Sequence, residues 1–236
     1  MLRRTLFLAQ VIAITAPVAA FGATIVGNGG NVGVPDGSIP LPPSGDTTVQ
    51  YVSTNGGVDG VGANPDGSST NPTDGSTYTT ATFTPGVGGS LKFAFNFISS
   101  DGTNGGSYPD NAWVDLVDVT SPSITELFSS TTTVTPLSGG TNASVLGSWS
   151  GQCYGAGCGN TGWESVSHDF SDTDTYYLEF GVVNANDTLY DSALYFDGAE
   201  ENGRSLTTTP EPGTLAIIGS GLLALAGVRR LRRSKN

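Results

Sequence analysis

Residues 90–99, SLKFAFNFIS, alternate strictly between large apolar side chains and smaller or polar ones. Leu91, Phe93, Phe95 and Phe97 occupy every second position. In an extended chain such positions share one face of a sheet. A face with four large apolar side chains is stable only when a second layer covers it, so this segment predicts a layered β protein.

The same alternation recurs at 175–183, where Tyr176, Leu178, Phe180 and Val182 share one face. Between the two ends of the chain no segment has the periodicity of a helix, and Gly- and Asp-rich turns separate short β-branched or aromatic runs. These runs predict an all-β protein with an antiparallel β-sandwich, jelly-roll-like, with an immunoglobulin-like sandwich as the alternative. Strands are expected at 47–53, 77–83, 90–99, 110–119, 123–129, 131–134, 145–149, 163–170, 175–183 and 191–197.

Composition divides residues 21–209 into three regions. Residues 21–76 are rich in Gly, Asn and Asp, with repeated Asp-Gly pairs that favour turns, so we expect loops there apart from the strand at 47–53. The sandwich domain is expected at 77–200. A linker is expected at 201–209.

The N-terminal residues have the three-part order of a secretory signal peptide. Arg3 and Arg4 precede an apolar run at 6–16, and small residues follow at 18–20. We expect residues 1–20 to be removed by signal peptidase after Ala20, although a cut after Gly22 would also suit the sequence. An uncleaved anchor is the alternative, but the run is short for a membrane span of about 20 residues.

A second apolar block at 215–228 precedes a basic C-terminus that contains Arg229, Arg230, Arg232 and Arg233. Such a cluster stays on the cytoplasmic side, which places the body outside. The block predicts a single transmembrane helix, short enough to suit a transient insertion in the inner membrane. Just before it, Pro210, Glu211 and Pro212 keep the chain extended, a shape that a processing enzyme can bind.

Pro-Glu-Pro, an apolar helix and an Arg-rich terminus, in this order at 210–236, resemble the PEP-CTERM sorting signal. The body is similar to the extracellular β-sandwich modules that often precede this signal, in residues 95–102 and 191–197. The resemblance implies recognition by exosortase, which removes the tail. It also implies a bacterial cell-surface or extracellular-matrix protein in an exopolysaccharide or biofilm context. The alternative is an ordinary C-terminal anchor after a Pro-containing linker.

Charge restricts the partners of the body. Residues 24–209 contain 20 acidic residues but only two basic ones, Lys92 and Arg204, for a formal charge of -18. Such a surface repels nucleic acid and anionic lipid, so we expect no nucleic-acid partner. Cations and neutral polymers such as exopolysaccharide suit it better.

Cys153 and Cys158 are the two cysteines, close enough in sequence to close one loop. In an oxidising compartment they predict a disulfide. A zinc site is disfavoured because His168 is the single histidine, and two thiolates with one imidazole do not make the usual four-ligand set.

Asp101, Asp110, Asp115 and Asp197 suggest a calcium hypothesis, in which these four carboxylates converge and supply the hard oxygen ligands that Ca²⁺ prefers. Their spacing matches no EF-hand, and solvated turn aspartates are the simpler interpretation. No other cofactor is expected.

Three aromatic residues around the cysteines, Trp149, Tyr154 and Trp163, are candidates for glycan contact. No catalytic motif is present in the sequence, so we expect no catalytic residues and a non-enzymatic structural protein. A carbohydrate-binding or adhesive module is one alternative. A glycan-acting hydrolase is the other, with its carboxylate pair drawn from Asp115, Asp118, Glu164 and Glu179.

Overall fold

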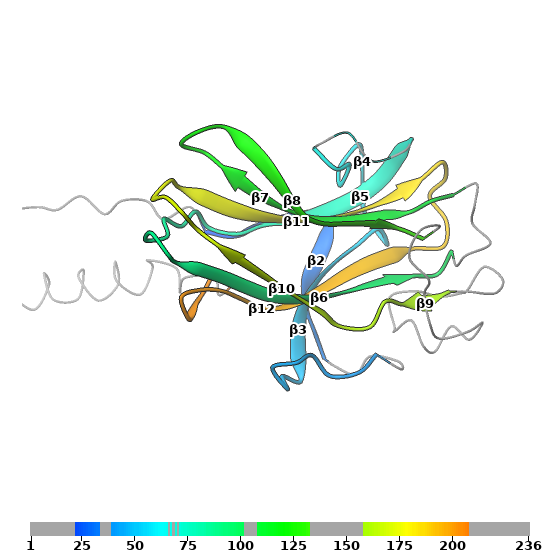
Figure 1. Cartoon of the computed structure of the whole chain (residues 1–236). Helices are drawn as coiled ribbons and strands as arrows, with labels where there is room; N and C mark the ends of the chain where they lie inside the picture. Colours follow the sequence, from blue (N-terminus) through cyan, green and yellow to red (C-terminus); the bar gives the residue numbers. More distant parts are fainter. Residues whose placement is uncertain are drawn as a thin grey trace, which may run out of the picture.

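The structure is a computed structural model, and it describes residues 22–33, 39–65, 67, 69, 71–101, 108–132 and 158–207. The predicted signal peptide, sorting motif, membrane helix and basic tail lie outside these residues, as do Cys153, Trp149, Tyr154 and the strand expected at 145–149. Among the described residues, every regular element is a β-strand (Figure 1).

The strands form two antiparallel sheets that lie one over the other, as Figure 1 shows. The first sheet has the order β1-β5-β11-β7-β8, with β4 beside β5, and the second has the order β10-β6-β12-β3-β2, with β9 beside β6 and β13 beside β12. The strands of the first sheet are β1 (Thr24–Val26), β4 (Val58–Asp59), β5 (Pro72–Thr79), β7 (Asn111–Asp118), β8 (Ser123–Thr131) and β11 (Tyr176–Ala185). Those of the second are β2 (Asn28–Gly33), β3 (Thr48–Ser53), β6 (Ser90–Ser99), β9 (Gly159–Asn160), β10 (Glu164–Asp169), β12 (Ser192–Glu201) and β13 (Arg204–Ser205). The predicted antiparallel β-sandwich is confirmed.

Connections between the long strands distinguish the two sandwich types. Along β3, β5, β6, β7, β8, β10, β11 and β12 the chain changes sheet at every step except the turn from β7 to β8. Immunoglobulin-like sandwiches keep several consecutive strands in one sheet. The alternation seen here favours the jelly-roll arrangement, in which two Greek keys wind together.

The N-terminal region is more regular than the sequence suggests. Strands β1 and β2 replace expected loop, and β5 begins at Pro72 rather than at residue 77. Strand β3 pairs with β12, and β1 pairs with β5, so β1 to β4 belong to the same two sheets as the later strands. The expectation of loops was wrong because Gly-rich β2, with the sequence NGGNVG, owes its extended shape to the ladder with β3 rather than to its own propensities.

The main core fills the space between the sheets. Phe93, Phe95 and Phe97 of β6 face Leu178 and Phe180 of β11, in agreement with the alternation in the sequence. The rings of Phe180 and Phe196 stack with centroids 4.0 Å apart. Burial of each such ring contributes about 1.5–3 kcal/mol to the free energy of folding, so this layer is the main source of stability.

Each sheet also has a buried patch on its outer face. On the first sheet, Trp113 is fully buried and its Nε1 donates to the carbonyl of Gly62, 2.9 Å away. The indole lies against Gly181, where an added Cβ would come within 2.2 Å of the ring, so glycine is required there. On the second sheet, a cluster containing Ile39, Ile98 and Tyr195 packs against Trp163.

Candidate functional site

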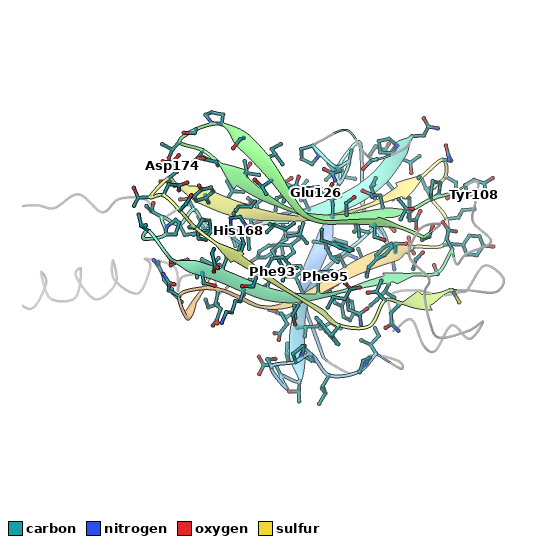
Figure 2. The ribbon with its side chains drawn as sticks, in the orientation of Figure 1. Phe93, Phe95, Tyr108, Glu126, His168 and Asp174 are labelled. Atoms are coloured by element: carbon teal, nitrogen blue, oxygen red, sulfur yellow. The ribbon has the colours of Figure 1, made fainter. Side chains whose placement is uncertain are left out.

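At one end of the space between the sheets, the inward-facing positions change from apolar to polar. The alternation that places Phe97, Ala112, Val182 and Leu194 in the core continues to Asp101, Asp110, Asn184 and Ser192. Asp74 of β5 and Ser130 of β8 continue the inward faces of their strands at the same end. We call these six residues the acidic layer: Asp74, Asp101, Asp110, Ser130, Asn184 and Ser192. In Figure 2 this end lies near the label of Tyr108, whose carbonyl accepts a hydrogen bond of 3.0 Å from the Asp110 amide.

Asp110 is the centre of the acidic layer and is fully buried. The amide of Ala185 donates to its Oδ1 at 3.3 Å, and the hydroxyl of Ser192 donates to its Oδ2. Burial raises the pKa of the Asp110 carboxyl well above its usual range, and the neighbouring charge of Asp101 raises it further. The Asp110 side chain is also hydrogen-bonded to that of Asp101.

Asp101 is the second buried carboxyl of the layer, with only 1% of its surface exposed. The pKa of its carboxyl is raised to about 7, mainly by burial; the hydrogen bond with Asp110 acts to lower the pKa, and the charges of Asp187 and Asp191 act to raise it. Two buried acids that share a proton are costly to hold together, because each ionised form lacks the solvation it would have in water.

Three oxygens of the acidic layer are buried and have no hydrogen-bond partner among the described residues: Asp101 Oδ2, Ser130 Oγ and Asn184 Oδ1. The amide nitrogen of Asn184 is used, since it donates to Asp74 Oδ1 at 3.2 Å. Buried polar atoms are nearly always paired, so three such atoms on neighbouring strands are an exception that requires explanation.

The two basic residues of the body lie away from this layer. Lys92 is opposite Glu200 in the ladder of β6 and β12, and Arg204 is on β13. Arg204 is opposite Glu201 of β12, so both basic residues lie at the end of β12 that is away from Ser192. No described Lys or Arg side chain therefore offsets the charge of the acidic layer.

The structure brings together only two of the four aspartates in the calcium hypothesis, Asp101 and Asp110. Asp115 lies on the outer face of β7, opposite Glu179 of β11. Asp197 lies on β12 of the second sheet, where its carboxylate accepts a hydrogen bond from the hydroxyl of Ser44. The expected convergence of all four was wrong, because Asp115 has the opposite strand parity to Asp110 and Asp197 belongs to the far half of β12. Within the described ranges, no group of three or more Asp, Glu, His or Cys side chains is arranged to hold a metal ion.

The sequence interpretation missed Asn184, Ser192 and Ser130. The alternation of inward-facing positions could have identified two of them. Asn184 is the next inward position after Leu178, Phe180 and Val182, and Ser192 is the inward position before Leu194 and Phe196. A polar residue that continues an apolar face marks the end of the core.

The carboxylates considered for a hydrolase are separated or buried. Asp115 and Glu179 face each other across β7 and β11, but Asp115 has no exposed surface. Asp118 accepts hydrogen bonds from the amides of Thr120 and Ser121 in the turn after β7, and Glu164 lies on the other sheet.

The aromatic and cysteine predictions are covered only in part. Trp163 is half-buried, and its Nε1 donates to the carbonyl of Pro40 at 2.7 Å, so its ring packs on the second sheet. Trp149 and Tyr154 lie outside the described residues. Cys158 is buried, but Cys153 is not described, so the disulfide stays a prediction.

A hollow of about 610 Å³ lies beside β2 and β3, with Asn31, Asp46, Gln50 and Asp197 among its polar lining. At its edge, Gln50 Nε2 and the hydroxyl of Tyr78 both donate to the carbonyl of Thr207, at 2.8 and 3.1 Å. These two bonds hold the last described residue on the body.

Residues 208–233, which begin directly after Thr207, match the family described as the PEP-CTERM protein-sorting motif. The chain carries a PEP-CTERM sorting motif. The motif implies that this protein is exported, is anchored transiently in the membrane and is processed by exosortase. No helix in the described part of the chain is long and apolar enough to cross a membrane, and the predicted span at 215–228 lies outside that part.

The solved structures that are similar to this chain are distant. One is TmCBM61 in complex with β-1,4-galactotriose, with 8% identity, a TM-score of 0.37, and coverage of 75% of this chain and 88% of that chain. Another is the K1 cleaved adhesin domain of Lys-gingipain from Porphyromonas gingivalis W83, with 12% identity, a TM-score of 0.35, and coverage of 75% and 91%. Likenesses at this level do not specify a function. No curated protein matches the sequence.

Proposed function

We propose that this chain is a non-enzymatic structural protein of the cell surface or extracellular matrix, processed by exosortase after export. The observation that carries the proposal is the sorting motif at 208–233, joined directly to a folded, acidic β-sandwich. The net charge of -18 over residues 24–209 supports a body that stays soluble among neutral polymers, such as exopolysaccharide, without binding anionic surfaces.

The length of the tether supports processing close to the body. Thr207 is bound to Gln50 and Tyr78, and Pro210 follows three positions later in the chain. At about 3.6 Å per residue the motif lies within roughly 11 Å of the sandwich. Exosortase must therefore bind Pro-Glu-Pro beside a folded domain.

The test is terminal-peptide and intact-mass analysis of the protein recovered from its native cell surface. We expect wild-type protein that lacks residues 1–20 and the residues that follow the Pro-Glu-Pro region. A Glu211→Ala variant should keep its Arg-rich tail and stay in the inner membrane, whereas a matched Glu200→Ala variant on β12 should be processed normally. A wild-type protein that keeps Arg229–Arg233 would overturn the processing step.

Glycan binding is a second candidate, favoured by the hollow beside β2 and β3. Gln50 Oε1 is buried at its edge without a hydrogen-bond partner among the described residues, and Asp46 and Asn31 add polar groups suited to sugar hydroxyls. A glycan array with the exported protein should then show binding that is lost in Asn31→Ala but kept in Asn71→Ala. Signals at background for wild-type protein would remove this candidate.

A further inference from the structure

We propose that the acidic layer is a binding site for a hard divalent cation of the calcium class, held between the two sheets by Asp101, Asp110 and Asn184. Such a site is separate from export and processing. The three residues lie at the end of the sandwich where they continue the inward faces of β6, β7 and β11. Asp101 Oδ2 and Asn184 Oδ1 are both buried and lack a hydrogen-bond partner among the described residues.

A cation accounts for the unpaired oxygens. Placed between Asp101, Asp110 and Asn184, it would give Asp101 Oδ2 the partner that it lacks. Asn184 Oδ1 would gain a partner while its amide nitrogen still binds Asp74.

The type of ligand favours calcium. Every side-chain group of the layer that can bind a metal is an oxygen: carboxylates, the amide of Asn184 and the hydroxyls of Ser130 and Ser192. His168 lies at the other end of the sandwich, as Figure 2 shows, and the buried Cys158 belongs to the patch on the outer face of the second sheet. Oxygen-only sites of irregular geometry suit Ca²⁺, whereas Zn²⁺ prefers nitrogen and sulfur.

The coordination shell is built from few carboxylates. No third Asp or Glu side chain in the described residues stands in ligating position. Two carboxylates, one amide oxygen and the hydroxyl of Ser192 leave room for water among the six to eight ligands that Ca²⁺ takes. A cation here would link the ends of β6, β7, β11 and β12 across both sheets, so its binding should raise the Tm of the protein.

The experiment is a thermal melt of the exported protein after treatment with chelator, with and without added CaCl₂, together with calorimetric titration of CaCl₂. A Ca²⁺ concentration one hundred times Kd should raise the Tm of the wild-type protein by roughly 5–10 °C, and the titration should give one site. The Asp101→Asn variant should lose the Tm shift. Without calcium it should melt no lower than wild-type protein, because its buried charge is gone.

The matched control is Asp197→Asn, the same change at a half-buried aspartate outside the acidic layer, which should keep the full Tm shift. If Asp101→Asn does not fold, Asn184→Ala serves as the second variant and should lower calcium affinity at least tenfold. The proposal is overturned if wild-type Tm is the same in calcium and in chelator with no heat of binding. It is also overturned if Asp101→Asn keeps the wild-type affinity.

Discussion

The two ends of the space between the sheets are built from opposite chemistry on the same strands. Strand β11 starts with Tyr176 among the rings of Phe83 and Phe170, with centroids 6.2 and 5.0 Å apart, and ends with Asn184 in the acidic layer. We call Phe83, Phe170 and Tyr176 the aromatic end. In Figure 2 the aromatic end lies near Asp174 and His168, and the acidic layer lies near Tyr108.

This difference teaches that the strands need not be uniform to form one sandwich. The aromatic end is closed by apolar contact, which depends on shape and is insensitive to ions. The acidic layer is closed by hydrogen bonds between polar and acidic side chains. We therefore expect the aromatic end to set the baseline stability of the fold, and the acidic layer to make stability depend on pH and on calcium.

The largest expected effect is at the aromatic end. Phe170→Ala removes ring contacts with Phe83, Tyr176 and His168 and leaves a cavity, so the free energy of unfolding should fall by about 3–5 kcal/mol. Urea unfolding followed by tryptophan fluorescence measures the loss. Val87→Ala, at a residue that is 73% exposed, should change stability by less than about 0.5 kcal/mol. Equal losses in the two variants would mean that the aromatic end is not a closed core.

A smaller effect is expected in the acidic layer. Ser192→Ala removes the hydroxyl that donates to Asp110 Oδ2, and it should cost about 1–3 kcal/mol because the carboxyl stays buried. The same urea experiment measures it, in chelator and in calcium. The exposed Ser123→Ala on β8 is the control and should be neutral. A neutral Ser192→Ala would show that the layer is hydrated rather than closed.

The smallest effect at neutral pH concerns Tyr176, whose hydroxyl donates to Asp172 Oδ1 at 2.8 Å. Burial, together with the hydrogen bond and charge of Asp172, raises the pKa of Tyr176 to about 12. The unfolded chain ionises this phenol near its ordinary pKa of 10, so stability should fall between pH 10 and about pH 12. Tyr176→Phe should flatten that slope, as followed by urea unfolding at each pH.

Absorbance at 295 nm supplies the control for the Tyr176 prediction. In wild-type protein, Tyr176 should ionise near pH 12, and the Asp172→Asn variant should move this step toward pH 10. If Tyr176→Phe leaves both the slope and the titration unchanged, another tyrosine is responsible.

The alternation of apolar and polar residues in the sequence predicted much of the fold, but it predicted the acidic layer only in part. The strand expected at 90–99 has those bounds in the structure, because four large apolar residues leave one way to face the core. Strands β1 and β2 were not predicted, because NGGNVG and a three-residue strand have no pattern apart from their partners. Asp101 and Asp110 were candidate oxygen ligands from the sequence. Their pairing, and their separation from Asp197, could not be predicted, because both depend on which sheet each strand joins.

The anchoring of Thr207 has a mechanical consequence. Any force on a C-terminal attachment enters the body through the two side-chain bonds to Thr207, then through Leu206, which is buried in the core, and then through β13, a two-residue strand at the edge of the long strand β12. Such a short ladder opens one residue at a time, while β12 is held on both sides by β6 and β3. Under tension this segment would yield first and lengthen the tether by a few residues, which protects the sandwich from unfolding.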